Sequence, residues 1–130
     1  MKLEWELDHV TATTPEDINF SLMSLVADCC AATEGIPVIS AIHVQFVDDL
    51  TIQQINREHR GIDRATDVLS FPTIRYRPGQ SAKSAQRAMK REYDADSGAC
   101  FLGDILISRE HAVAQALDYG HSVQRELCYL

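Results

Sequence analysis

The chain has 130 residues, 45% of them hydrophobic and 24% charged, a composition that suits one soluble globular domain. No apolar run approaches the roughly 20 residues that span a bilayer, and the N-terminal MKLEWELD lacks the apolar centre of a secretory signal. We therefore expect a cytoplasmic protein with no membrane partner. The net charge of −7, taken alone, argues against nucleic acid as a partner, because Lys and Arg supply most of the affinity for phosphates.

The first third of the chain predicts a strand, a helix and a second strand. Residues 2–8 alternate apolar and charged side chains, which is the period of a half-buried strand. The sequence TTPED then offers a Thr cap and places Pro15 at the first helical position, and apolar residues recur at helical spacing until Gly35. In VISAIHVQFVDD apolar and polar residues alternate, so we expect a second strand that ends at Asp48.

The middle of the chain predicts a helix, a short strand and an insertion. Asp48 or Asp49 caps the helix LTIQQINREHR, which ends at Gly61, and the apolar strand DVLSFP ends at Pro72. Residues 73–99 combine Pro, Gly and Ser without a long apolar period, so we expect a flexible insertion in which SAKSAQRAMKREY forms a short surface helix.

The last third of the chain predicts a strand and two helices. FLGDILIS is almost continuously apolar, which is typical of a strand that is central or covered on both faces. Ser108 caps a helix that ends at Gly120, and Ser122 caps a second helix whose apolar stripe runs to Leu130. The core side of the first of these helices is expected to carry Ala112, Val113, Ala116 and Leu117.

The order of these elements, βαβαββαα, predicts an α+β fold. We expect a single mixed four-stranded sheet with helices packed on it, in one domain that covers residues 1–130.

The cysteines and histidines do not form a recognisable metal site. The four cysteines contain no CxxC pair, and we expect them to be reduced residues of the core. The histidines offer no HExxH and no pair four residues apart, so none of them is predicted as a metal ligand. His43 is interpreted as a surface residue of its strand. The chain also lacks GxGxxG, GxSxG and Walker-type loops.

Basic residues gather in one segment of this acidic chain. Residues 57–91 carry a net charge of +6, and the remainder carries −13. This segment could contact a polyanion, although a solvated charged loop explains it equally well. If it binds RNA, the residues expected to do so are Arg57, Arg60, Arg64, Arg87, Lys90 and Arg91.

Polar residues beside the apolar strands are the candidates for chemistry. Asp104 lies within FLGDILIS, where a buried carboxylate needs a partner, so it either bonds to backbone or Ser groups of a neighbouring strand or takes a direct part in catalysis. Thr66, Asp67 and Ser70 surround the start of the strand DVLSFP, where turn formation explains them about as well as a functional role does.

Arg60 occupies the last turn before Gly61, where the helix dipole favours any cation. Its planar guanidinium also suits a phosphate, which it can bind through two parallel hydrogen bonds. The residues themselves leave these two interpretations open.

Taken together, NREHRGIDRATDVLSFP, FLGDILIS and SREHAVAQALDYGHSVQREL resemble the YbeY family of bacterial rRNA maturation factors, which are zinc-dependent endoribonucleases. The resemblance covers about residues 44–130. It implies that Arg60 matches the arginine that the family places beside its metal, as a catalytic residue that holds the RNA phosphate.

The family pattern continues, after a helix like SVQRELCYL, into His-Gly-x-Leu-His-Leu-x-Gly-Tyr-Asp-His, whose three histidines bind zinc. We therefore expect a domain truncated at its C-terminus, with zinc implied by the family but no metal ligand in this chain. The resemblance implies cleavage of single-stranded RNA in rRNA maturation and ribosome quality control, with rRNA and the ribosome or ribosomal proteins as partners. A non-catalytic RNA- or ribosome-binding module and a metal-dependent hydrolase of another substrate remain the alternatives.

Overall fold

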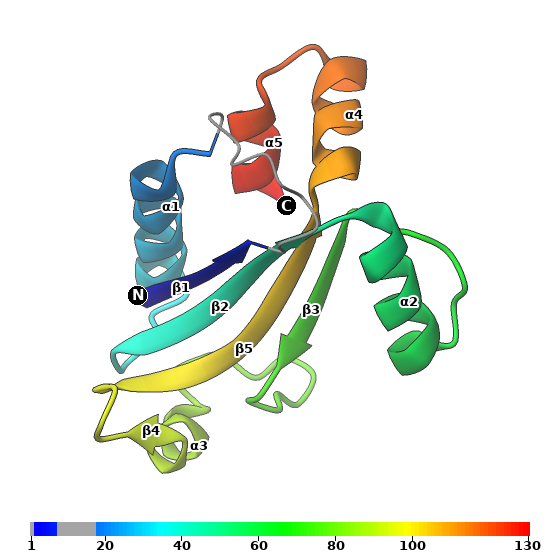
Figure 1. Ribbon diagram of the computed structural model, residues 1–130. Coiled ribbons are helices and arrows are strands. Elements are labelled where there is room, and N and C mark those ends of the chain that lie inside the picture. The colour runs from blue at the N-terminus through cyan, green and yellow to red at the C-terminus, as the bar shows by residue number, and fades with distance from the viewer. Residues whose placement is uncertain (1, 8–17) are drawn as a thin grey trace.

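The computed structural model describes the backbone of residues 2–7 and the whole of residues 18–130 (Figure 1). In chain order the elements are β1 Lys2–Leu7, α1 Phe20–Thr33, β2 Ser40–Val47, α2 Asp49–Arg60, β3 Val68–Pro72, α3 Gln86–Arg91, β4 Tyr93–Asp94, β5 Ala99–Ser108, α4 Arg109–Tyr119 and α5 Val123–Tyr129. This architecture confirms the predicted α+β class. The helix α3 falls within the predicted surface helix SAKSAQRAMKREY but is shorter and buries Met89, and the two-residue strand β4 was not predicted.

The strands form one mixed sheet in the order β1-β2-β5-β3, with β4 paired to the beginning of β5. β1, β2 and β5 are parallel neighbours, and β3 runs antiparallel to β5. β5 is therefore central, as its apolar sequence predicted. The pairing of β2 with β5 shifts register between Ala41 and Ile42, which marks a bulge in the sheet.

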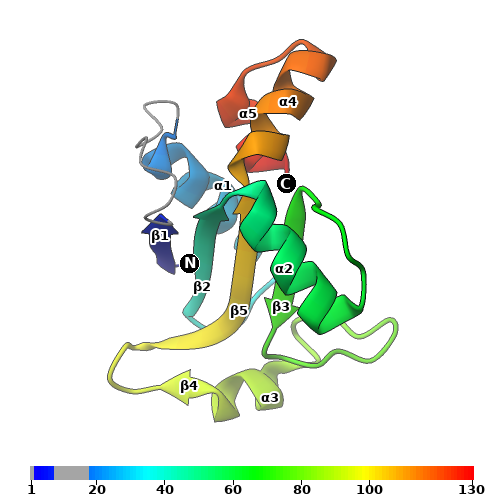
Figure 2. The same ribbon diagram turned by 45° about the vertical axis from the view of Figure 1, so that its right-hand side comes forward.

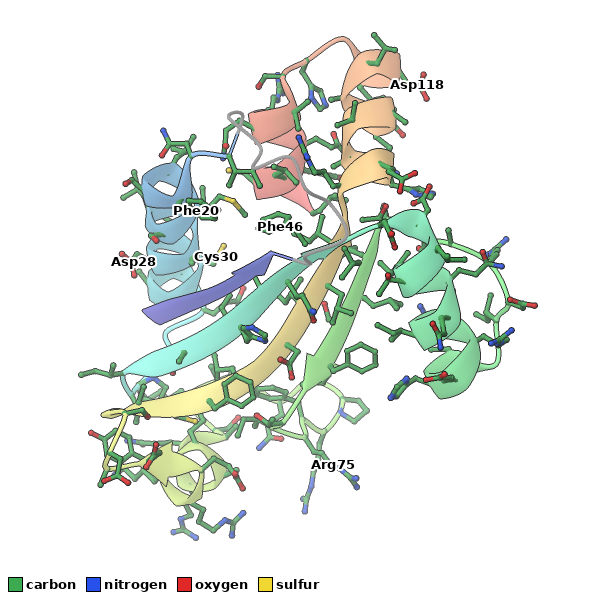
Figure 3. All side chains as sticks on the ribbon, in the orientation of Figure 1. Phe20, Asp28, Cys30, Phe46, Arg75 and Asp118 are labelled. Carbon is green, nitrogen blue, oxygen red and sulfur yellow. The ribbon has the colours of Figure 1, made fainter. Side chains whose placement is uncertain are left out.

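One face of the sheet packs against α1, α4 and α5 (Figure 1). Val44, Phe46 and Ile107 of the strands form a buried cluster with Ala112 of α4 and Leu127 of α5. Figure 3 shows Phe46 on the side of β2 that faces α1 and α5. A cavity of about 220 Å³ opens between α1, the sheet and α5. The contact of α1 with this face is thus incomplete.

The opposite face carries α2, which lies in front of β3 and the upper part of β5 in Figure 2. Val47, Ile52, Leu69 and Leu106 form the buried cluster beneath it. A third cluster lies at the lower end of the sheet, where Met89 of α3 packs with Ile74, Ala85 and Cys100. Residues 73–99 thus contribute buried side chains as well as α3 and β4.

Most predicted element ends agree with the structure, because they carry clear capping residues. Asp48, Ser108 and Ser122 cap α2, α4 and α5, and Gly61 ends α2 in a left-handed conformation, with φ of 69°. The start of α1 was predicted wrongly, since the helix begins at Phe20 with Asn19 as its cap. The TTPED cap lies outside the described residues.

Two sets of residues predicted in the core are exposed. All four cysteines are free, but Cys29 and Cys30 are exposed and only Cys100 is buried. On α4 the small residues face the core, whereas 44% of Val113 and 82% of Leu117 are exposed. Among the described residues no helix has the length and apolar character needed to cross a membrane.

Candidate functional site

The end of α2 is held in place by a buried asparagine. Asn56 is 2% exposed, and its Nδ2 donates to the Arg64 carbonyl at 2.9 Å. The Ile62 N–H donates to the Asn56 carbonyl at 3.4 Å, so both ends of the loop after Gly61 are attached to one residue. Within residues 18–130 no donor reaches Asn56 Oδ1. The Asn of the NREHRG sequence therefore fixes the path of the chain that carries the nearby arginines.

Three arginines project from this helix end and the loop that follows. Arg57, Arg60 and Arg64 are all exposed, and no described carboxylate lies within salt-bridge distance of them. Asp63, which lies between them in sequence, accepts instead from Gln53 Nε2 at 3.1 Å. Guanidinium groups without an internal anion remain available for a phosphate.

The basic residues of α3 form a separate group. Arg87, Lys90 and Arg91 are exposed on α3, which lies at the lower end of the sheet and away from α2 in both ribbon views (Figures 1 and 2). Figure 3 places the side chain of Arg75 on this lower side as well. The predicted RNA-binding residues therefore occupy two areas, one at the end of α2 and one on α3.

Asp67 connects β3 to its neighbours. Its carboxylate accepts from the Val68 N–H at 2.8 Å, from Thr66 Oγ1 at 3.3 Å and from Gln115 Nε2 of α4 at 3.2 Å. Its carbonyl accepts from the Ser108 N–H at 2.8 Å. Burial opposes ionisation, but the hydrogen bonds from Gln115, Val68 and Thr66 outweigh it and lower the pKa of Asp67. These contacts support the turn-forming interpretation of the Thr-Asp pair.

Gly103 permits β3 to lie close to β5. Its φ is +144°, and a Cβ at this position would collide with the Phe71 carbonyl oxygen and lie 2.9 Å from the Pro72 Cα. A side chain would therefore push β3 away from the central strand. The Leu-Gly-Asp sequence needs glycine for this close approach.

Asp104 has a partner, although a different one from that expected. Its Oδ1 lies 2.9 Å from His43 Nδ1 of the neighbouring strand β2. Its side chain is 42% exposed and that of His43 is 23% exposed, so the expectation of a buried carboxylate was wrong. Asp104 and His43 lie outside the buried cluster beneath α2, which reaches only as far as Phe71 in this row.

A second polar group joins α2 to α4, and the sequence indicated two of its members, Asp49 and Ser108, only as candidate helix caps. Asp49 Oδ1 lies 2.5 Å from Ser108 Oγ and 2.5 Å from His111 Nδ1. The serine donates to the carboxylate and not to the histidine, which lies 3.4 Å away, so the arrangement differs from that of an activated serine nucleophile. The three residues instead fix the starts of two helices at the carboxyl ends of β2 and β5. Only their capping positions could have indicated them.

The described part of the chain brings together no group of three His, Cys, Asp or Glu side chains that could hold a metal ion. Two His–Asp pairs come together in this part of the chain, His43 with Asp104 and His111 with Asp49. The residues that the structure describes therefore do not fit the zinc that the family resemblance implies, since a zinc site needs three or four convergent ligands.

The fold and the arginines define an α+β protein in which the cations at the end of α2 pair with no carboxylate of residues 18–130. Comparison with known proteins then identifies the family. The family model of Endoribonuclease YbeY matches residues 8–130. The chain belongs to the YbeY family.

Relatives agree with this assignment. The chain is 43% identical over 104 residues to the "Endoribonuclease YbeY" of Clostridium kluyveri, which covers 79% of the chain and 63% of that protein. It is 41% identical over 106 residues to that of Clostridium botulinum strain 657, which covers 81% and 64%. The protein of the same name in Clostridium acetobutylicum is 39% identical over 119 residues, which covers 91% and 71%. The chain thus spans less than two thirds of the length of the first two.

A solved structure shares the fold. The solution structure of TM1509 from Thermotoga maritima superimposes with a TM-score of 0.51 over 96% of this chain and 63% of that one. The two are 18% identical, so this likeness concerns the fold alone.

Proposed function

We propose that the protein is an endoribonuclease that cuts single-stranded RNA in the cytoplasm, in rRNA maturation and ribosome quality control. Its partners would be rRNA and the ribosome or ribosomal proteins. Membership of the YbeY family carries the proposal. The unpaired arginines at the end of α2 support it, because they give an acidic chain a local surface that can bind phosphates.

Arg60 is proposed as the catalytic residue. It follows His59 in the last turn of α2, in the segment that Asn56 holds, and its planar guanidinium can bind two oxygens of one phosphate. Negative charge grows on the phosphate oxygens as the bond to the leaving oxygen breaks, and a fixed cation stabilises that state more than the ground state. Arg57 and Arg64 would bind neighbouring phosphates.

Metal dependence is proposed on the family resemblance. A bound zinc ion would supply an activated water, but the described residues provide no set of ligands for it. We therefore assign to this chain's residues the binding of RNA and the stabilisation of the phosphate.

RNA binding is tested by the salt dependence of affinity. The dissociation constant of a labelled single-stranded oligonucleotide is measured between 50 and 300 mM salt for the chain, for the triple variant R87A/K90A/R91A and for R125A as the control outside the segment. Each phosphate contact contributes about −0.7 to the slope of log affinity against log salt. The triple variant should flatten the slope by about 2, and R125A should leave it unchanged. If the slope of log affinity against log salt is equal for all three proteins, the basic residues of α3 do not contact the RNA.

Cleavage is tested with Arg60→Lys, which keeps the charge and loses the planar fork. We expect the rate of RNA cleavage to fall by about tenfold or more while affinity falls by less than about threefold, because the fork matters most in the transition state. If Arg60→Lys cleaves RNA at the rate of the parent protein, Arg60 is only a cation at the helix end and the proposed catalytic role is wrong. Salt-dependent binding without any cleavage by the parent protein would instead identify the non-catalytic RNA-binding module.

A further inference from the structure

A row of three side chains crosses the sheet beside the end of α2, from Phe71, which packs against the cluster beneath that helix, to two partly exposed polar residues. Phe71 of β3 is paired in register with Asp104 of β5, which is paired in register with His43 of β2. All three lie on the same face as Leu69 and Leu106, one row below the cluster under α2. Figure 2 shows no helix in front of the lower half of β2 and β5.

An aromatic pair stands at one end of this row. The ring of His59, in the last turn of α2, meets the ring of Phe71 edge to face, with centroids 5.2 Å apart and an angle of 62°. His59 is exposed and Phe71 is partly exposed. His59 Nδ1 lies 3.1 Å from the Ile55 carbonyl, so it donates this bond and the ring is held in place. Such fixed aromatic rings are platforms on which nucleobases stack.

A hydrogen-bond acceptor lies beside the aromatic pair. Residues directly opposite in an antiparallel pair have Cβ atoms about 5 Å apart, so a base stacked on Phe71 would lie next to Asp104. One carboxylate oxygen of Asp104 is bonded to His43, and no described donor reaches the other one. A half-exposed carboxylate favours a base edge that presents donors, and guanine presents two of them, N1–H and N2–H, side by side.

Charge complementarity selects RNA as the occupant of this surface. The arginines at the end of α2 flank the platform in sequence, because Arg60 follows His59 directly and Arg57 precedes it by two residues. Neither is paired with a carboxylate in residues 18–130. The last turn of α2 therefore carries two cations that can bind the phosphates of a nucleotide stacked on His59, and the carboxylate between them, Glu58, accepts a hydrogen bond from Gln54 at 3.4 Å.

We propose that His59, Phe71 and Asp104 form a subsite that holds one unstacked guanine of single-stranded RNA beside Arg60. This inference rests on the proposed function, since it names the base that the ribonuclease reads next to its phosphate-binding arginine. Phe71 and His59 supply the stacking surface. The carboxylate of Asp104, oriented by His43, selects guanine over the other bases.

The test measures binding of three fluorescent hexanucleotides, all-U, U with one central A and U with one central G, at fixed salt. The chain should bind the G oligonucleotide about tenfold more tightly than the A oligonucleotide. Asp104→Asn retains an acceptor for His43 but presents a donor to the base, so the G preference should fall to within about twofold. Asp96→Asn, which removes the same charge at an exposed position in the connection between β4 and β5, should keep the preference.

Stacking is tested with His59→Ala and Phe71→Leu, against Tyr93→Leu as an exposed aromatic control. Both site variants should weaken binding of all three oligonucleotides about tenfold without changing the salt slope. The fold of both variants is checked by circular dichroism. His59 is exposed, so His59→Ala preserves the fold even if Phe71→Leu does not. Salt-dependent binding of all oligonucleotides with no G preference and no effect of His59→Ala would overturn the subsite alone. No binding of any oligonucleotide by the parent chain would overturn the proposed function as well.

Discussion

Gly103→Ala tests the close contact between β3 and β5 directly. The glycine has a φ of +144°, and the new methyl group would meet the Phe71 carbonyl and the Pro72 Cα, both of which belong to the backbone. A backbone cannot move aside as a flexible side chain can, so either β3 shifts or β5 changes its conformation. Both changes disturb the row of side chains that includes Asp104 and Phe71.

The expected cost has two parts. A non-glycine residue in this region of φ costs about 1–3 kcal/mol, and forcing a methyl group into packed backbone costs about 1–3 kcal/mol more. Their sum, about 2–6 kcal/mol, is a large share of the roughly 5–15 kcal/mol that stabilises a domain. With a urea dependence of about 2 kcal/mol per molar, the midpoint should fall by about 1–3 M.

The assay is urea unfolding followed by circular dichroism, with Gly79→Ala as the control. Gly79 also has a positive φ, +78°, but a Cβ there meets nothing within 4 Å. Its substitution therefore costs only the backbone strain, about 1–2 kcal/mol. If the two variants lose the same stability, the collision with β3 is absent and the reasoning is wrong.

Three further substitutions test the contacts around the site. Hydrogen bonds lower the pKa of Asp67 from 3.8, so its carboxylate stabilises the fold above that pH, and this stabilisation is lost as the pH falls through the lowered pKa. The free energy of unfolding, measured at a series of acidic pH values, should show this loss in the parent protein and not in Asp67→Asn. Asn56→Ala should cost about 1–3 kcal/mol in urea unfolding and speed amide exchange in residues 62–66, whereas exposed Gln54→Ala should do neither. Ser108→Ala removes the cap of α4 and should lower the unfolding free energy by about 1–2 kcal/mol; an unchanged midpoint would show that Asp49 and His111 hold the helix without it.

The sequence predicted those parts of the fold that local chemistry determines. Asp48 caps α2 through the Thr51 N–H at 2.8 Å, and Gly61 ends it, so both ends could be read from the chain. The start of α1 could not, because several residues before Asn19 also resemble caps. On α4, Leu117 was placed in the core by periodicity alone, whereas tertiary packing decides which side of the helix is covered.

The candidate site was predicted less completely, since it depends on pairing between distant strands. The sequence indicated that Asp104 needs a partner, but the partner His43 follows from a register that includes a bulge near Ala41. The contact between His59 and Phe71 depends on how α2 lies against β3. Arg60 could be singled out from the sequence because its neighbourhood, from Asn56 to Gly61, is a local pattern that matches the family, and its catalytic role stays a prediction.

The cavity between α1 and the sheet has a consequence for local unfolding. Met23 is the only residue of α1 that is buried, and the space of about 220 Å³ behind the helix contributes no packing contacts. The helix should therefore open at a smaller free energy than the central strands, and its amides should exchange with solvent first.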